Sequence, residues 1–263
     1  MDIEKSLDLV ASRFHSHRRF KAFLHLFTQS TFGIWSLHFA AKYGYKKIIQ
    51  FLIENCADVN VQNRNLNSAV HFAAKNGHKE IVEILISSGA NINIRNINGN
   101  TPLHYSTKNG FVDIVQILVK NKAHVNYEDL NGNTPLHLAA EGHHDEIVKM
   151  LIRHGGYVNT INKKCNTPLH LAVSSDYERA VEILLQNGAD VNSMCVRNCT
   201  PLHIAVTRQN IKITELLLQK RANVHAKFHC KDGYITLTAL NIATTNRNKE
   251  IMQLLLNYGA KFK

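Results

Sequence analysis

The sequence lacks the long apolar segments that mark a chain built into a membrane. Hydrophobic residues make up 44% of it, yet they never form the uninterrupted run of about 18 that a transmembrane helix needs. The start, Met1-Asp2-Ile3-Glu4, is acidic where a secretory signal is basic, and no apolar signal segment follows. We therefore expect a cytoplasmic protein, with the nucleus, or the host cytosol for a secreted effector, as alternatives.

Cysteine is also scarce, and its pattern excludes a disulfide framework. An odd number, five, is scattered along the chain, which favours a reducing compartment. Cys195, Cys199, His229 and Cys230 could offer soft ligands to zinc, but their spacing matches no recognised finger. Adjacent side chains in an extended hairpin also point to opposite faces. We accordingly predict no metal and no other cofactor.

Enzyme motifs are missing as well. The sequence has no phosphate loop, no Gly-x-Ser-x-Gly, no His-Glu-x-x-His and no paired carboxylates outside ordinary helix faces. His143-His144-Asp145-Glu146 resembles a ligand cluster, but it lies where a helix is expected to begin, and acidic residues there favour the helix dipole. The sequence therefore predicts no catalytic residues.

What the sequence does have is a repeat of 33 residues. Histidine recurs on this period, and four of the copies lie within Thr-Pro-Leu-His, as at 101–104. The threonine hydroxyl suits a helix N-cap, and the proline suits the first helical position, where a missing N–H costs nothing. Each copy therefore marks the start of a short helix. The six histidines are His38, His71, His104, His137, His170 and His203.

The rest of each period predicts a second helix and a hairpin. Apolar pairs such as Ile81-Val82 and Ile84-Leu85 have the spacing of a buried helical stripe. Gly89 and its equivalents end that helix, where a left-handed residue is favoured. An asparagine series, Asn60 and every 33rd residue to Asn192, leads into polar hairpins such as 96–99. Helices this short are marginal alone, so the units must stack.

Two segments carry a resemblance to a known family. Gly-x-Thr-Pro-Leu-His-x-Ala-Ala at 132–140 and Gly-Ala-Asn-Ile-Asn at 89–93 closely resemble the ankyrin repeat family. The resemblance covers about residues 31–263 in seven copies and implies an all-α solenoid of stacked helix-turn-helix units joined by β-hairpin loops. We expect one elongated domain. Its predicted repeats are about 31–62, 63–95, 96–128, 129–161, 162–194, 195–227 and 228–263.

The two ends of the array depart from the pattern. Residues 1–30 lack the repeat signature but have apolar residues at helical spacing, which predicts a helical cap on the first repeat. The first repeat is eroded, and the last has Asn241 in place of histidine, as capping units often do. The last hairpin carries five extra residues, which predicts a longer finger tipped by Asp232-Gly233. Loops accept added length at little cost, so the insertion is not assigned a function.

The resemblance also implies a function and the surface that carries it. In relatives, the motif histidine is a structural residue that ties neighbouring repeats, and partners bind in the concave groove and on the hairpin tips. We therefore predict a non-enzymatic scaffold that binds another protein. The candidate groove residues are Lys42, Tyr43, Lys75, Asn76, Lys108, Asn109, Glu141 and Arg208. The candidate tip residues are Arg64, Ile97, Leu130, Lys163, Lys164 and Arg197.

Charge indicates the kind of partner. Lys42, Lys75 and Lys108, here called the lysine ladder, occupy equivalent groove positions with expected steps of about 10 Å. The ladder suits an acidic protein surface, although lysine is also simply a good exposed helix former. The net charge is +11, but aromatics make up only 8%, and no nucleic-acid-reading motif is present. We predict a monomer that binds an acidic protein, and nucleic acid is disfavoured.

Two other functional classes remain open. The chain could be a targeting adaptor linked to a ubiquitin ligase or to signalling, or an effector directed at a host cell. In that case residues 1–30 are the expected recruiting segment, because no recruitment box follows the last repeat. It could also be the repeat portion of an arthropod latrotoxin-like toxin, an interpretation disfavoured by the absence of a membrane-inserting segment.

Overall fold

The computed structural model describes residues 31–229 and 236–262, and the chain divides into two compact units. The units are Met1–His124 and Val125–Lys263, so their boundary falls inside the predicted third repeat. The helical cap predicted for residues 1–30, the Asp232-Gly233 tip and Cys230 lie outside the described residues.

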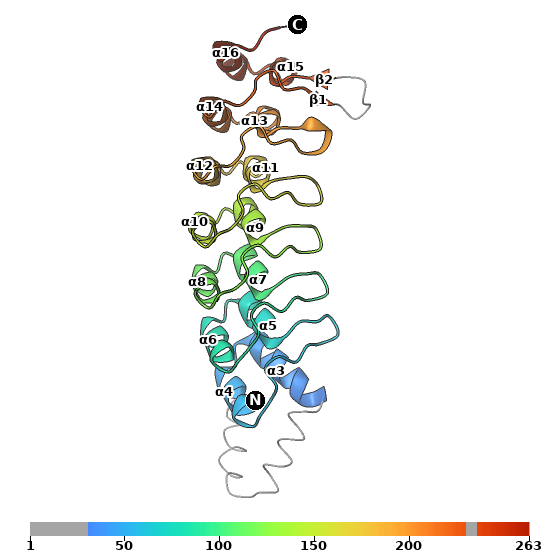
Figure 1. The fold of residues 1–263 in the computed structure, drawn as a ribbon, viewed down its shortest axis with the longest axis vertical. Helices are drawn as coiled ribbons and strands as arrows, with labels where there is room; N and C mark the ends of the chain where they lie inside the picture. The colour runs from blue at the N-terminus through green and yellow to red at the C-terminus, as the bar shows by residue number, and fades with distance from the viewer. Residues whose placement is uncertain (1–30, 230–235, 263) are drawn as a thin grey trace, which may run out of the picture. The chain divides into compact units, whose positions relative to one another are not determined.

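The described part of the first unit is a stack of helix pairs (Figure 1). The first helices of the pairs lie in one column and the second helices in another, with the hairpins projecting beside the first column. Helix α3 packs on α5 and α5 on α7, while α4 packs on α6 and α6 on α8. The helices are α3 (Thr31–Tyr43), α4 (Lys46–Glu54), α5 (Ala69–Asn76), α6 (Lys79–Ser87), α7 (Pro102–Lys108) and α8 (Val112–Lys120).

The second unit repeats the same architecture. Its first helices pack in chain order on one another, and so do its second helices. The α-helices are α9 (Pro135–Glu141), α10 (Asp145–Arg153), α11 (Pro168–Ser174), α12 (Glu178–Gln186), α13 (Pro201–Arg208), α14 (Ile211–Gln219), α15 (Ala239–Thr245) and α16 (Lys249–Asn257). A 3-10 turn, η1 (Val196–Asn198), lies in the hairpin before α13.

The last hairpin of the second unit differs from the others. Strand β1 (Phe228–His229) pairs antiparallel with β2 (Thr236–Leu237), so that Phe228 faces Leu237 and His229 faces Thr236. The other described hairpins contain no strands and are closed by turn hydrogen bonds, such as Asn96 N–H to Asn100 O and Gly99 N–H to Asn96 O, both at 2.9 Å. The extra length predicted for this finger therefore begins as a short β-ladder.

The helix starts follow the predicted chemistry. At the Thr-Pro positions the threonine has extended backbone and caps the helix, and proline takes the first turn. The cap is reciprocal, because Nδ1 of His137 accepts the backbone N–H of Thr134 at 3.2 Å. Since Nδ1 accepts, Nε2 carries the ring proton and donates to the carbonyl of Asn166 in the next hairpin, at 3.0 Å.

The same bond pattern recurs along both units. Nε2 of His71 lies 3.1 Å from the Asn100 carbonyl, and Nε2 of His203 lies 3.1 Å from that of Ala226. His38, which lacks a Thr-Pro cap, still reaches the Val61 carbonyl at 3.0 Å. Within each unit these histidines therefore tie a first helix to the next hairpin, and their predicted structural role is confirmed.

The predicted asparagine series has a role that the sequence did not show. Asn159 donates its amide N–H to the Gly188 carbonyl at 3.0 Å, and its Oδ1 accepts the backbone N–H of Asp190 at 2.8 Å. Asn60 makes the equivalent pair of bonds to Gly89 and Asn91. Each such side chain clamps the end of the next repeat's second helix.

The second helices bury one face, as predicted. Ile81, Val82 and Leu85 of α6 are buried, and Gly89 beyond its end has φ of 85°. Across residues 31–229 and 236–262, no helix is long and apolar enough to cross a membrane. The all-α fold of stacked helix-turn-helix pairs is confirmed.

Candidate protein-binding surface

The lysine ladder belongs to a larger surface on the first unit. Lys42, Lys75 and Lys108 end α3, α5 and α7 and are exposed. Three residues before each lysine stands an aromatic residue, and positions three apart lie on the same side of a helix. We call this surface the aromatic–lysine face. Its residues are Phe39, Lys42, Phe72, Lys75, Tyr105 and Lys108.

The repeat stacking holds the aromatic rings of this face. The Phe72 ring lies 5.5 Å from that of His38, and the Tyr105 ring meets that of His71 edge-on at 6.2 Å. The Tyr105 hydroxyl also accepts a bond of 2.8 Å from the Asn96 side-chain amide. Because the Phe72 and Tyr105 rings rest on the motif histidine of the preceding repeat, this part of the face is already ordered without a partner.

Two of the three ladder lysines lie over aromatic rings. The Lys75 ammonium is 5.4 Å from the centroid of Tyr105, and that of Lys42 is 4.9 Å from the centroid of Tyr43. Contacts of this kind are worth about 0.5–1 kcal/mol at exposed sites. They orient the cations and leave them accessible to a carboxylate.

The edge of the face on α3 is an exposed aromatic cluster. Phe39 is 47% exposed and Tyr43 is 50% exposed, and their rings are 4.6 Å apart. Tyr45 stacks on Tyr43 at 6.3 Å. Tyr43, a predicted binding residue, is thus part of a contiguous apolar edge beside the first lysine.

Lysines on the second helices behave differently. Lys46 pairs with Glu80 at 2.6 Å, and Lys79 pairs with Asp113 at 3.7 Å, each bridge linking neighbouring repeats. Such exposed pairs are worth about 0–1 kcal/mol. The second-helix side of the first unit therefore pairs these lysines with acidic residues, whereas the first-helix side presents Lys42 and Lys75 over aromatic rings.

The aromatic–lysine pattern does not continue in the second unit. At the positions equivalent to Lys42, this unit has Glu141, Ser174 and Thr207. Arg208 donates a hydrogen bond to the Ser174 carbonyl and lies 4.0 Å from Asp176. Its guanidinium is thus already engaged within the protein, although the side chain stays exposed.

Two of the predicted groove asparagines also make internal bonds. The Asn109 amide donates to the Lys75 carbonyl at 2.7 Å, and the Asn76 amide donates to the Phe72 carbonyl at 2.8 Å. Both side chains are exposed. They hold the ends of α5 and α7, and they remain candidates for partner contact.

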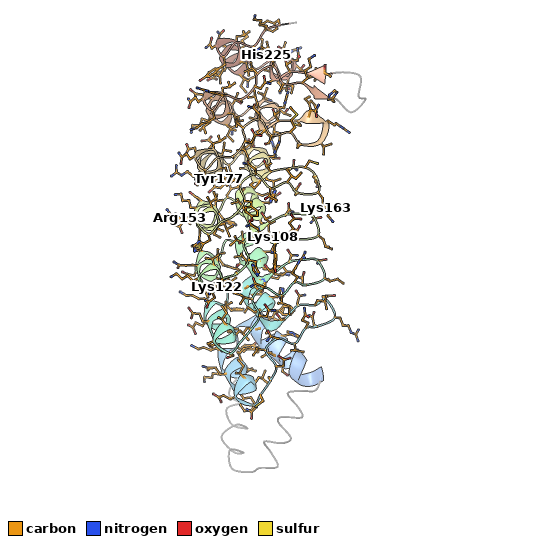
Figure 2. All side chains as sticks on the ribbon, viewed as in Figure 1. Lys108, Lys122, Arg153, Lys163, Tyr177 and His225 are labelled. Carbon is orange, nitrogen blue, oxygen red and sulfur yellow. The ribbon has the colours of Figure 1, made fainter. Side chains whose placement is uncertain are left out.

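The predicted hairpin-tip residues are all exposed. Four of them stand one repeat apart in sequence at the very tip of their hairpins: Arg64, Ile97, Leu130 and Lys163. Neighbouring tips are joined through backbone, since Ile97 N–H donates to Asn65 O at 3.0 Å and Lys163 N–H to Asn131 O at 2.9 Å. Figure 2 shows Lys163 on the hairpin side of the second unit, away from Arg153. Lys164 and Arg197 are exposed beside them.

Sequence inspection missed two exposed apolar residues at equivalent positions on neighbouring hairpins of the second unit. Ile161 and Met194 are each 56% exposed and stand one repeat apart. The aromatic residues of the aromatic–lysine face were missed in the same way. Counting one position beyond each motif histidine finds Phe39, Phe72 and Tyr105, a column that counting four and five positions passes over.

The His143 cluster is a structural bridge. The His143 ring stacks on Tyr177 at 4.3 Å, and its Nε2 lies 3.0 Å from the Ser175 carbonyl. The Tyr177 hydroxyl donates to Asp145 at the first position of α10. Burial, reinforced by this carboxylate, raises the pKa of Tyr177 to about 12. The cluster joins consecutive repeats of the second unit.

No metal site is formed by the residues whose positions are described, because no three His, Cys, Asp or Glu side chains gather closely enough. Burial lowers the pKa of His71 to about 4, and burial also lowers the pKa of His38, His137 and His203. A buried imidazole with both nitrogens bonded to backbone, as in His71 and His137, is suited to structure rather than to proton transfer.

Comparison with known proteins agrees with this geometry. The family model for ankyrin repeats matches three times, over residues 37–129, 124–195 and 192–263. The chain therefore belongs to the ankyrin repeat family, whose stacked repeats are protein-interaction scaffolds.

A solved structure shows the same fold. The crystal structure of the human ASB11 ankyrin repeat domain is similar over 86% of this chain and 99% of that chain, with 27% identity and a TM-score of 0.74. No curated protein matches the sequence significantly.

Proposed function

We propose that this protein is a non-enzymatic scaffold that binds an acidic segment of a partner protein on the aromatic–lysine face of its first unit. The observation that carries the proposal is the pairing, in three consecutive repeats, of an aromatic residue with a lysine one helical turn later. No such pairing occurs at the equivalent positions of the second unit, where the residues are Leu138/Glu141, Leu171/Ser174 and Ile204/Thr207.

The face supports binding in two ways. The lysines provide a positive field that speeds encounter with an acidic segment and fixes its register on the repeats. The rings provide apolar area that is held in place before binding, which reduces the ordering cost. A partner segment with acidic residues and intervening apolar residues fits both features, and the hairpin tips then add selectivity.

Lysine at a helix C-terminus has another explanation, because cations there interact favourably with the helix dipole. That explanation predicts a small effect on stability and none on binding. The aromatic column distinguishes the two, since the dipole places no demand on the residue three positions earlier.

The test reverses the ladder charges. Partners are captured with the wild-type protein, and the affinity of each is then measured with Lys42→Glu/Lys75→Glu/Lys108→Glu at low and high ionic strength. We expect the triple variant to lose at least about a hundredfold in affinity at low salt and to show a flatter salt dependence.

The matched control is Lys47→Glu/Lys120→Glu/Lys122→Glu, which changes the net charge of the first unit equally but away from the face. We expect it to keep most of the affinity. A second arm, Phe39→Ala, removes an exposed ring with little cost to folding and should weaken binding without altering the salt slope. Equal losses in both triple variants would refute a specific role for the face.

The adaptor, effector and toxin interpretations make separate predictions. Loss of a defined set of partners on deleting residues 1–30 supports an adaptor or effector. Leakage of vesicles on adding the protein supports a toxin. The scaffold proposal expects neither result.

A further inference from the structure

The hairpin before α13 departs from the other hairpins in its chemistry. In the preceding repeats the two residues that close the hairpin are polar and carry side-chain amides or a carboxylate. The first is Asn63, Asn96, Asp129 or Asn162, and the second is Asn67, Asn100, Asn133 or Asn166. In this hairpin both positions are cysteine, Cys195 and Cys199.

The replaced residues shape the hairpin. In the preceding one, Oδ1 of Asn162 accepts the backbone N–H of Lys164 at 2.9 Å and that of Asn166 at 3.0 Å. A thiol is a weak acceptor and cannot match these bonds. The backbone of this hairpin also differs at one position, because Arg197 adopts a left-handed φ of 64° that the equivalent residues of the preceding hairpins do not adopt, whereas Asn198, with φ of 60°, is left-handed like Cys165 in the hairpin before.

The two thiols lie together. Cys195 N–H donates to the Cys199 carbonyl at 2.8 Å, which sets the two residues opposite each other across the hairpin. The Cys199 thiol is the main group that lowers the pKa of the Cys195 thiol, as expected of two thiols on facing positions, and both residues are partly exposed. A disulfide needs opposed Cβ atoms about 3.5–4.5 Å apart, a spacing that hairpin neighbours approach.

A third group lies beside the pair. The Nε2 of His170 is 3.3 Å from the Cys199 carbonyl, which places the imidazole against this hairpin, where it also helps to lower the pKa of Cys195. Nδ1 of His170 accepts the Thr167 N–H, so Nε2 carries the proton and can donate to a thiolate. Together the Cys199 thiol and this imidazole lower the pKa of Cys195 to about 5.

We propose that Cys195 and Cys199 form a modification site at which a peroxide oxidises the pair to an intramolecular disulfide. The Cys195 thiolate attacks one peroxide oxygen, the O–O bond breaks, and the released hydroxide takes up a proton to become water. Cys195 is then a sulfenic acid. The Cys199 sulfur attacks it, and the sulfenic hydroxyl leaves with the Cys199 proton as a second water.

In total, two thiols and one hydrogen peroxide give one disulfide and two waters, so the peroxide is reduced as the pair is oxidised. The disulfide replaces the closure that asparagine supplies in the other hairpins. Val196 and Arg197 lie between the cysteines, so oxidation fixes the tip that presents them. The proposal is based on the residues of one hairpin and is independent of the binding proposed for the aromatic–lysine face.

The experiment treats the protein with hydrogen peroxide, blocks free thiols, and digests it with trypsin without reduction. Trypsin cuts after Arg179, Arg197 and Arg208, so Cys195 and Cys199 fall in separate peptides. We expect peptides 180–197 and 198–208 to stay linked after oxidation and to separate on adding dithiothreitol. The exposed single cysteines Cys56 and Cys165 serve as internal controls and should not form linked peptides.

Two variants assign the order of the steps. Cys199→Ser should accumulate a sulfenic acid at Cys195 that dimedone traps, whereas Cys195→Ser should give no sulfenic acid at Cys199. At pH 6, Cys195 should also alkylate about tenfold faster than the thiol of a short unstructured peptide, because its larger thiolate fraction outweighs its lower nucleophilicity. Circular dichroism checks that both variants remain folded.

Unlinked peptides after Cys56 and Cys165 have been oxidised would overturn the proposal. A disulfide from Cys195 or Cys199 to Cys230 would overturn it too. So would dimedone trapping of a sulfenic acid at Cys199 rather than at Cys195. A linked pair that forms in wild type and in neither serine variant supports it.

Discussion

At the scale of single residues, the motif histidine works because its two ring nitrogens have different partners. Nδ1 accepts a backbone N–H at the start of its own helix, and Nε2 donates to a carbonyl of the next hairpin. Asn241, which replaces the histidine in the last repeat, keeps only the first of these two bonds. Its Oδ1 accepts the Thr238 N–H at 2.9 Å, as a histidine Nδ1 does, while an asparagine is too short to reach a further hairpin.

This division of labour predicts a graded loss of stability at His137. His137→Ala removes the acceptor for Thr134 and the donor to Asn166 in a buried site, and it should cost about 3 kcal/mol. His137→Asn keeps the acceptor and should recover roughly half of that loss. Urea unfolding followed by circular dichroism measures both. Equal destabilisation by the two variants would contradict the separate roles of the nitrogens.

At the scale of elements, the hairpins are constrained by their neighbours as well as by their own turns. Gly132 has φ of 76°, and a Cβ there would lie 2.9 Å from the backbone nitrogen of Lys163 in the next hairpin. Gly188 has φ of 83°, but a Cβ there would meet no atom within 4 Å. The two glycines therefore share backbone strain and differ in whether another repeat lies against them.

This difference makes a matched pair of variants. Gly188→Ala should cost about 1 kcal/mol, the penalty for a left-handed alanine. Gly132→Ala carries the same penalty and must also push the next hairpin away, so it should cost about 2–4 kcal/mol. Thermal unfolding of the two proteins side by side gives the comparison. A Gly132→Ala protein as stable as Gly188→Ala would show that the hairpins can separate freely.

The elements that the sequence predicted are those whose signal is local. A threonine, a proline and a histidine within four residues specify a helix start, so the first helices were predicted at the right positions. The clamp made by Asn159 joins it to Gly188 and Asp190, about one repeat away. The 33-residue spacing of this asparagine was visible in the sequence. The backbone groups that it bonds come within reach only after the repeats stack.

The candidate binding surface likewise has features that the sequence predicts and features that it does not. Exposure of Lys42, Lys75 and Lys108 followed from the register, because their positions are fixed by the motif histidine. The bond from Arg208 to the Ser174 carbonyl and that from Asn109 to the Lys75 carbonyl did not, since each crosses a repeat interface. The position of a residue within the repeat thus predicts whether its side chain is exposed. Stacking of the repeats determines which exposed side chains form hydrogen bonds within the protein.

At the scale of the whole molecule, the repeated histidine makes stability depend on pH. Burial lowers the pKa of His71 to about 4, and it lowers the pKa of His38, His137 and His203 as well. An unfolded histidine titrates near pH 6.5, so below that pH the unfolded chain binds protons that the folded chain does not. The folded state is therefore fully favoured above about pH 6.5 and loses free energy as the pH falls toward 4.

His71 alone accounts for a loss of about 3 kcal/mol over this window, and the other buried histidines add to it. Between pH 6.5 and 5 most carboxylates remain ionised, so this part of the curve reports histidine. We expect urea unfolding at a series of pH values to show a free energy of unfolding that is flat above pH 7 and falls steeply below 6.5. His71→Asn should make the fall shallower by up to about 1.4 kcal/mol per pH unit. A free energy that stays constant down to pH 5 would mean that these imidazoles take up protons without leaving their carbonyl partners.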